Sequence, residues 1–232
     1  MRIESLGLVA YDEALVLQER ALESVSAGLS PERIFLLEHP HVFTVGRSFR
    51  TADQSDPQLD SSIPTYDVSR GGDITYHGPG QLVGYPILDL RRRARDIHSY
   101  LRNLEECLMR TVSEFGLTGY RRKGLTGVWT EEGKLASIGV SVRKWITMHG
   151  FALNVAPDLH YFGMIDACGI RDCPVTSMSA LLGHFVSIRE VESVVTRQLA
   201  QVLSPLDPVP AGRDEISQSQ GSQPGKPPRP PA

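Results

Sequence analysis

The sequence predicts an α+β domain in which a mixed, mostly antiparallel sheet carries packed helices on one face. Short apolar runs recur in pairs separated by glycine or proline turns, which is typical of hairpins. A few longer segments show apolar residues at helical spacing. Regular alternation of strand and helix is absent from the sequence, as is a G-x-G-x-x-G loop after a strand. A dinucleotide-binding fold is therefore disfavoured.

The first half of the chain predicts one helix and several strands. Residues 11–26 show helical spacing. The apolar runs 34–37 and 42–45 predict two strands around a turn at His39-Pro40. A strand at 65–68 and another at 82–90 flank the glycine-rich stretch R70-G-G-D-I-T-Y-H-G-P-G-Q81.

The second half predicts two helices and a hairpin. Residues 96–115 form the clearest helix, with one apolar stripe along it. Segments 127–130 and 135–142 predict a hairpin that turns at 131–133, and 146–155 is its next antiparallel neighbour. A loop over 156–177 precedes the last predicted helix, which covers 188–203.

Composition limits the classes of protein. Residues 1–204 are predicted to be one folded domain, and the Pro-, Ser-, Gly- and Gln-rich residues 205–232 are predicted to be a disordered tail. A net charge of -3 and a pI near 6.2 give no general attraction to nucleic acid or to an anionic membrane. Neither a leader nor a long apolar run is present, so we expect a cytoplasmic protein.

The three cysteines are predicted to be free thiols, because they are few and odd in number. None of their spacings is C-x-x-C, which argues against structural zinc. Cys107 falls on the apolar stripe of the 96–115 helix, where a small buried residue is expected. Cys168 and Cys173 lie in the 156–177 loop and are the candidates for a nucleophile, although a loop cysteine is more often incidental.

A catalytic cysteine needs a neighbouring base or cation, because a free thiol is mostly protonated at neutral pH. His77 and His149 are candidates for this base. A partly buried lysine is another, and Lys134 begins a strand at the predicted hairpin turn, although it also fits an ordinary turn lysine. His39-x-His41 has no acidic or thiol ligand at partner spacing, so packing and hydrogen bonding are favoured over a metal site.

The glycine-rich stretch carries a family resemblance. R70-G-G-D-I-T-Y-H-G-P-G-Q-L-V-G-Y-P86 closely resembles the signature of the octanoyltransferases of lipoate biosynthesis, in the lipoate–biotin protein ligase superfamily. The resemblance continues, in the family's order, through L37-E-H-P-H-V-F-T-V-G-R47, G127-V-W129, K134-L-A-S-I-G-V140, H149-G-F-A-L-N154 and A167-C-G-I170. It spans about residues 34–180 and implies the ligase-type catalytic fold.

The resemblance also implies site residues. Cys168 is implied to be the acyl-accepting nucleophile and Lys134 its acid–base partner. Ala167 stands where the family usually has proline, a departure that leaves the thiol and the following glycine in place. Backbone N–H groups near Cys168 or Gly139 are candidate oxyanion donors. The residues implied to line the acyl pocket are Arg70, Gly71, Gly72, Asp73, Ile74, Thr75, Tyr76, His77, Ser137, Ile138, Gly139, Gly150, Phe151 and Ala152.

The activity that the resemblance implies is transfer of an octanoyl group from octanoyl-acyl carrier protein to a lysine of lipoyl domains, through an octanoyl-cysteine thioester. The acceptors would be the 2-oxoacid dehydrogenase complexes and the glycine cleavage protein, and neither a cofactor nor a metal would be needed. Acidic partners could dock on the basic residues 91–93, 121–123 or 143–144, although solvated surface is the default interpretation.

Three other activities are compatible with the same motifs. An ATP-dependent lipoate or octanoate ligase would need no nucleophilic cysteine. An enzyme that moves octanoyl groups between lipoyl-type carriers would differ in its donor. A non-catalytic acyl-binding protein would not need both Cys168 and Lys134.

Overall fold

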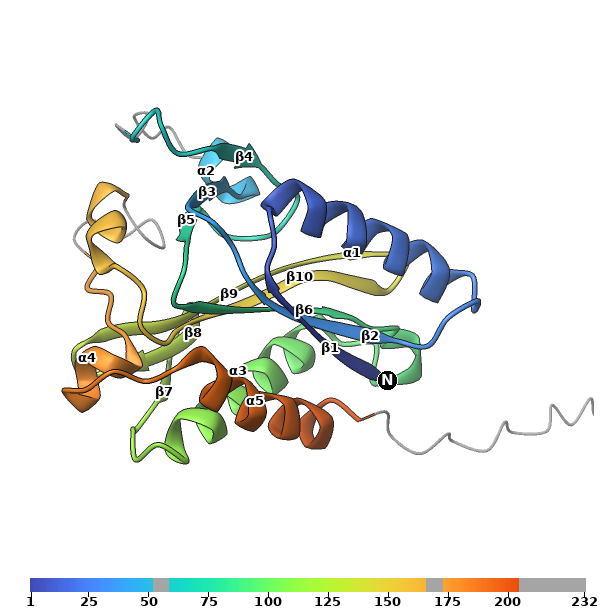
Figure 1. The fold of residues 1–232 in the computed structure, drawn as a ribbon. Helices are drawn as coiled ribbons and strands as arrows, with labels where there is room; N and C mark the ends of the chain where they lie inside the picture. Colours follow the sequence, from blue (N-terminus) through green and yellow to red (C-terminus); the bar gives the residue numbers. More distant parts are fainter. Residues whose placement is uncertain (52–58, 166–172, 205–232) are drawn as a thin grey trace, which may run out of the picture.

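The computed structural model describes residues 1–51, 59–165 and 173–204 (Figure 1). Cys168 and its neighbours Ala167 and Gly169 lie outside these ranges, as does the tail predicted over 205–232. The proposed role of Cys168 and the predicted division at residue 204 therefore stay predictions.

A seven-stranded mixed sheet forms the centre of the domain, as predicted. β1 and β2 pair in parallel, and the other neighbouring strands pair antiparallel. In spatial order the strands are β1 (Arg2–Leu8), β2 (Arg33–Glu38), β6 (Gln81–Ile87), β10 (Ile146–Asn154), β9 (Gly133–Arg143), β8 (Leu125–Thr130) and β7 (Tyr120–Arg122).

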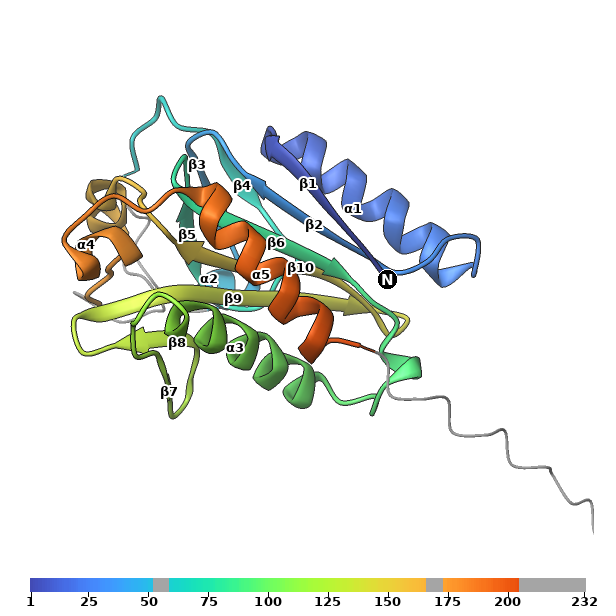
Figure 2. The ribbon, with the colours of Figure 1, turned by 60° about the horizontal axis from the view of Figure 1, so that its bottom comes forward.

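Helices cover both faces of this sheet, so the prediction of helices on one face is wrong. α1 (Tyr11–Ser26) packs against β6 and β10 on one face. α3 (Ile97–Ser113) and α5 (Ile188–Val202) pack against each other and against the opposite face. Figures 1 and 2 show the sheet between these two helical layers.

The residues of β2 explain why two layers are needed. Phe35 and Leu37 belong to the apolar cluster under α1, whereas Ile34 and Leu36 belong to the cluster under α3 and α5. Successive side chains of a strand point to opposite faces, so an unbroken apolar run requires cover on both sides. Residues 34–37 are all buried.

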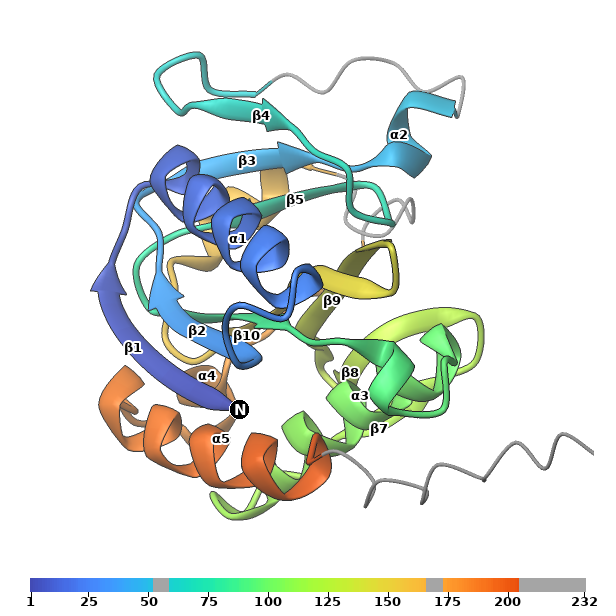
Figure 3. The same ribbon diagram turned by 90° about the vertical axis from the view of Figure 1, so that its right-hand side faces the viewer.

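A second, three-stranded sheet lies on the α1 side of the main sheet (Figure 3). Its order is β4 (Thr65–Asp67), β3 (Val42–Val45) and β5 (Ile74–His77). β3 pairs with β4 in parallel and with β5 antiparallel. The two runs predicted as strands around a turn, β2 and β3, therefore belong to different sheets.

Capping side chains mark the starts of α3 and α5. Asp96 accepts hydrogen bonds from the backbone N–H groups of His98 and Ser99 at 2.8 and 3.2 Å, so α3 begins at Ile97. Ser187 and Glu190 form a capping box at the start of α5. The shorter helices are α2 (Arg47–Thr51), η1 (Leu90–Arg92), η2 (Leu159–Met164) and α4 (Met178–Leu182).

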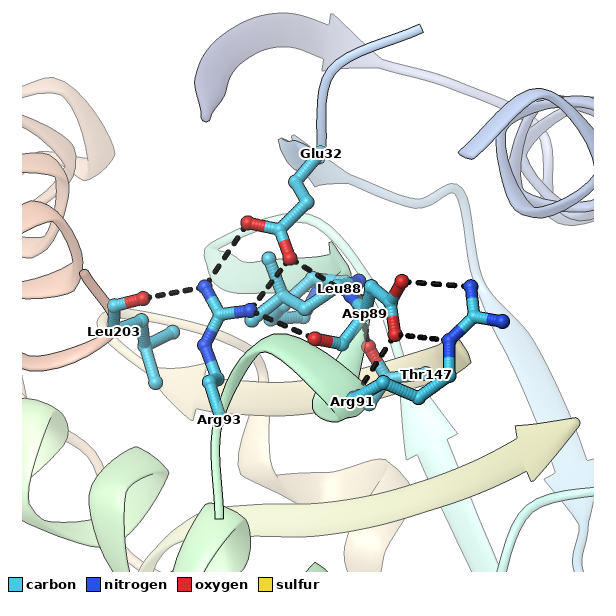
Figure 4. A network of polar contacts seen from close by, with 8 residues as sticks. Glu32, Leu88, Asp89, Arg91, Arg93, Thr147 and Leu203 are labelled. Atoms are coloured by element: carbon cyan, nitrogen blue, oxygen red, sulfur yellow. Dashed lines mark hydrogen bonds and ion pairs between the residues drawn. The ribbon is translucent and has the colours of Figure 1, made fainter. Parts of the chain in front are cut away.

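A buried polar network ties β2, η1 and the end of α5 together (Figure 4). The Arg93 guanidinium donates to both Glu32 carboxylate oxygens and, at 2.7 Å, to the carbonyl oxygen of Leu203. Asp89 donates its backbone N–H to Glu32 and its carboxylate accepts two hydrogen bonds from the Arg91 side chain. Arg91 and Arg93 are thus paired with carboxylates of the domain, as is Arg121 of the second basic stretch, which pairs with Glu105 and Glu106.

Within the described ranges, no helix combines the length and apolar character needed to cross a membrane.

Candidate functional site

A cavity of about 400 Å³ lies where the small sheet, α1 and the main sheet meet. Its volume is within the range of small-molecule sites. Most of its lining is apolar, which suits an acyl chain. The apolar lining residues are Ile74, Val83, Ile97, Leu101, Leu125, Ile138, Val140, Phe151 and Ala152.

The cavity brings together nearly all of the described residues that the motifs singled out. They come from β5 and the loop before it, from β9 and from β10, three segments separated in the sequence. Lys134 also contributes to the lining. The pocket residues expected from the motifs that do line it are Arg70, Gly71, Gly72, Asp73, Ile74, Thr75, His77, Ser137, Ile138, Gly139, Gly150, Phe151 and Ala152.

Tyr76 differs from this expectation, because it is not part of the cavity lining. Its ring stacks on Tyr161 at 4.8 Å between centroids, and its hydroxyl lies 2.6 Å from Nδ1 of His41. Phe43 and Phe162 complete this aromatic cluster. Strand β5 therefore turns the side chain of Tyr76 into the core of the small sheet.

Arg70 fixes the shape of the glycine-rich loop. Its buried guanidinium donates to the backbone carbonyl oxygens of Gly71 at 3.1 Å, Asp73 at 2.9 Å and Thr44 at 2.7 Å. It also donates to the Thr44 hydroxyl at 2.8 Å. Burial lowers the pKa of Arg70. These bonds hold the loop against β3, so Arg70 shapes the cavity wall and is not a proton carrier.

Glycines allow close backbone packing where β9 passes this loop and where β10 passes β6. Gly139 and Gly150 lie directly opposite each other. A Cβ on Gly139 would lie 3.0 Å from both Cδ of Arg70 and the carbonyl oxygen of Gly71. A Cβ on Gly150 would lie 2.1 Å from the carbonyl oxygen of Gly84. Side chains at either position would displace the loop or the neighbouring strand.

His77 and His149, the alternative bases, are buried and neutral at physiological pH. Burial is the main cause that lowers the pKa of His77 to about 3 and that of His149 to about 4. Nδ1 of His77 donates to Oε1 of Gln81 at 2.7 Å, since the Gln81 amide donates its own protons to Tyr76 and Asn154. A general base works best with a pKa near the working pH, so neither histidine is well suited.

Tyr11 and Tyr85 lie beside these histidines, and we call Tyr11, Arg70, His77, Tyr85 and His149 the histidine wall of the cavity. The Tyr11 ring stacks on His77, and the Tyr85 ring meets His149 edge to face. Burial raises the pKa of Tyr11 to about 12 and that of Tyr85 well above its ordinary value.

His39 connects Tyr85 of the histidine wall to the backbone of Val9 through hydrogen bonds, which is the hydrogen-bonding role expected for this residue. Nδ1 donates to the carbonyl oxygen of Val9 at 2.7 Å, which leaves Nε2 to accept from the Tyr85 hydroxyl at 2.7 Å. Burial lowers the pKa of His39 to about 4. Among the residues with described placement, no three histidine, cysteine or acidic side chains gather as metal ligands.

Lys134 contributes to the cavity from the start of β9. Residues 127–135, which we call the lysine hairpin, comprise the end of β8, the turn predicted at 131–133 and the start of β9. The backbone of Lys134 is held by hydrogen bonds to residues 174 and 176. Its N–H donates to Pro174 at 2.8 Å, and its carbonyl oxygen accepts from Thr176 at 3.1 Å. Lys134 is only 7% exposed.

The two described cysteines differ in their surroundings. Cys107 is fully buried in α3, as predicted, and burial raises the pKa of its thiol to about 12, which disfavours the reactive thiolate. Cys173 is partly exposed, and its Sγ lies 3.9 Å from the carbonyl oxygen of Pro174.

Several lining residues were missed from the sequence. Ile97 and Leu101 lie on the apolar stripe of the 96–115 helix, so their spacing predicted core packing, and Tyr11 was expected only as the first residue of the 11–26 helix. Val83, Tyr85, Leu125 and Val140 lie in strands where both faces are covered, and alternation could not tell the cavity from the core. Only the pairing of distant strands shows which of these residues line the cavity.

Comparisons with known proteins identify the family of the chain. The family model described as lipoyl protein ligase A/B catalytic domain matches residues 10–200. An octanoyltransferase of Geobacter metallireducens is 52% identical, over 84% of this chain and 90% of its own length. An octanoyltransferase of Syntrophotalea carbinolica is 49% identical, over 88% of this chain and 94% of its own.

Solved structures share the fold at low identity. A lipoate-protein ligase A bound with ATP superposes with a TM-score of 0.69 at 18% identity, covering 87% of this chain and 85% of its own. A putative lipoate protein ligase of T. acidophilum with bound lipoic acid gives 0.67 at 18% identity, with the same shares covered.

The chain belongs to the lipoyl protein ligase A/B catalytic-domain family. Its relatives at about half identity are curated octanoyltransferases, aligned over most of both chains. The protein is therefore an acyltransferase, and octanoyl transfer in protein lipoylation is the activity that these relatives support.

Proposed function

We propose that this acyltransferase takes an octanoyl group from octanoyl-acyl carrier protein onto Cys168 and passes it to a lysine of a lipoyl domain. The observation that carries the proposal is the shared cavity: Lys134 lies in the same lining as the glycine-rich loop and an apolar surface. The enzyme would act in the cytoplasm, on lipoyl domains of 2-oxoacid dehydrogenase complexes and of the glycine cleavage protein.

The first half-reaction exchanges one thioester for another. Lys134 takes the proton of the Cys168 thiol, and the thiolate attacks the octanoyl carbonyl. The bond to the carrier's phosphopantetheine sulfur breaks, and the leaving thiolate receives the proton from Lys134. Octanoyl-Cys168 and the free carrier thiol are the products. The donor is already an activated ester, so the step needs no ATP.

The second half-reaction forms the amide. The acceptor lysine attacks the octanoyl-Cys168 carbonyl as a neutral amine, and Lys134 receives the proton that the amine loses. Cys168 leaves and regains a proton, which restores the enzyme. One residue thus carries the proton in both directions, which fits a lysine whose exposure to bulk water is low.

The apolar lining gives an expectation for chain length. Each buried methylene contributes about 0.8 kcal/mol, so two fewer carbons cost about 1.6 kcal/mol. Hexanoyl-acyl carrier protein should therefore react with kcat/KM lower by about tenfold. Equal kcat/KM values for the two donors would show that the acyl chain does not lie in this cavity.

Intact-mass spectrometry tests the nucleophile and the donor together. The enzyme incubated with octanoyl-acyl carrier protein and no nucleotide should gain one octanoyl group, on Cys168. Cys168→Ser should gain none, whereas Cys173→Ser, the matched control in the same loop, should gain the full adduct. An adduct that requires ATP and free octanoate, or that is found on Cys173, would contradict the proposal.

A further inference from the structure

The side chain of Trp129 lies beside Lys134 inside the lysine hairpin. Trp129 is 1% exposed, and Nζ of Lys134 lies 5.5 Å from the centroid of its indole ring. This distance is within the range of a cation–π interaction, in which the negative face of the ring attracts an ammonium group. The same ring also carries the Arg122 guanidinium, at 5.1 Å.

A β-bulge creates this pairing. Val128 lies opposite Ala136, but the next residue, Trp129, lies opposite Lys134. Leu135 is therefore the extra residue of β9; in a regular register, Trp129 would face Leu135 and not Lys134. Bulges of this kind redirect a side chain and are frequent beside functional sites. Here the bulge brings Lys134 opposite the indole and into the cavity lining.

Both partners of the pair are held in place. The indole N–H of Trp129 donates to the carbonyl oxygen of Leu125 at 3.4 Å. The stem of Lys134 packs against Gly127, where a Cβ would lie 3.0 Å from Cε of Lys134. The N–H of Gly127 donates in turn to the buried carboxylate of Glu105 at 3.2 Å. The approach of the amine to the ring is thus built into the hairpin.

We infer that Trp129 is a positioning residue for Lys134, which keeps the amine at the cavity and stabilises its protonated form. This inference rests on the proton-carrying role proposed for Lys134. In each half-reaction Lys134 must hold a proton while little water is near. A buried aromatic face lowers the free energy of that charged form without forming a covalent bond or taking the proton itself.

Fluorinated tryptophan separates this role from simple packing. Fluorine withdraws charge from the ring face and changes the ring's volume very little, so a packing role is insensitive to it. The chain has two tryptophans, and the other, Trp145, is exposed on the turn between β9 and β10. In a Trp145→Phe background, mono-, di- and trifluorotryptophan therefore enter position 129 alone.

The readout is the pH at which the Lys134 amine becomes reactive. Trace acetic anhydride labels neutral amines, and mass spectrometry follows the labelling of Lys134 across pH. The midpoint should move to lower pH with each added fluorine, by about half to one pH unit over the series. Trp145→Phe with ordinary tryptophan should leave the midpoint unchanged. A midpoint that stays constant over the fluorine series would overturn the inference.

A second measurement keeps this inference distinct from the proposed function. The pH profile of kcat/KM for octanoyl transfer should shift along the same series, since Lys134 carries the proton. If labelling shifts but the profile does not, Trp129 positions an amine that the reaction does not use, and the proposed role of Lys134 fails. If neither shifts, the role of Trp129 fails while the Cys168 adduct can still form.

Discussion

On one side of the cavity, the histidine wall buries five groups that titrate or carry charge, which are Tyr11, Arg70, His77, Tyr85 and His149. On the other side, the lysine hairpin holds an amine beside an indole ring. Burial lowers the pKa of both histidines well below neutrality, so these residues hold the loop and strands without exchanging protons. The comparison indicates that nearness to the cavity does not make a residue a base. The role of a buried group depends on its protonation state and on its neighbours: the histidines are neutral, whereas the Lys134 amine lies beside an aromatic ring.

The largest effect is expected from Lys134→Ala. If the lysine hairpin supplies the base, single-turnover acylation by octanoyl-acyl carrier protein should slow by about 10² to 10⁴-fold. His149→Gln, the control from the histidine wall, should slow acylation by about tenfold or less, because His149 is neutral and serves the shape of the wall. Equal losses in the two variants, measured by quenched-flow mass spectrometry, would remove the distinction between the two sides.

Acid should destabilise the fold through the histidines. The folded pKa values of His39, His77 and His149 are about 4, about 3 and about 4, below the ordinary 6.5 of an unfolded chain. Between the folded and the unfolded pKa values, the unfolded chain binds more protons than the folded chain. The stabilisation from the neutral histidines is therefore fully present above pH 6.5 and decreases as the pH falls towards 4. For each histidine, the free energy of unfolding should be lower by about 2 kcal/mol at pH 5 than at pH 7.5.

Urea unfolding at pH 7.5 and pH 5 measures this loss. His39→Gln is the informative variant, because an amide can still donate to Val9 and accept from Tyr85. It should reduce the difference in unfolding free energy between the two pH values by about 2 kcal/mol. An unchanged difference would mean that His39 becomes protonated at no cost in the folded protein.

Arg70→Lys should affect substrate binding more than chemistry. A lysine ammonium is a point donor and cannot reach the carbonyl oxygens of Thr44, Gly71 and Asp73 at once, as the planar guanidinium does. The glycine-rich loop would lose its fixed shape, and KM for the donor should rise by about tenfold, a loss of about 1.4 kcal/mol. A fall in kcat at constant KM would instead place Arg70 in the proton chemistry.

Much of the fold could be predicted from local patterns. Residues 11–26 and 96–115 show helical stripes, and the turn at 131–133 joins two alternating runs, so α1, α3 and the β8–β9 hairpin follow from the sequence. β1 was missed, because its residues alternate weakly and half of the strand is exposed. β7 was missed for the same reason, being short and exposed throughout.

The site was predicted through motifs and not through geometry. The positions of Arg70, Lys134 and His149 in the sequence do not indicate that they line one cavity. Two contacts between distant segments bring them together: β9 pairs with β10, and the glycine-rich loop contacts β9. The two helical layers could have been inferred from the doubly buried run 34–37, since such a strand needs cover on both faces. The bulge at Leu135 leaves no recognisable trace in the sequence.

The smallest effect is expected from Thr44→Val, which removes two hydrogen bonds from the histidine wall: the one that the hydroxyl accepts from Arg70 and a longer one, of 3.5 Å, to Nε2 of His77. The Thr44 hydroxyl accepts from Arg70 at 2.8 Å, but the backbone carbonyl of the same residue keeps its own bond at 2.7 Å. The free energy of unfolding should fall by about 1 kcal/mol. KM should change less than in Arg70→Lys, because the loop keeps its bonds to Gly71 and Asp73. If Thr44→Val instead raised KM as much as Arg70→Lys, the hydroxyl and not the carbonyl oxygens would determine the loop's shape. The histidine wall would then depend on one side-chain contact, as the lysine hairpin depends on Trp129.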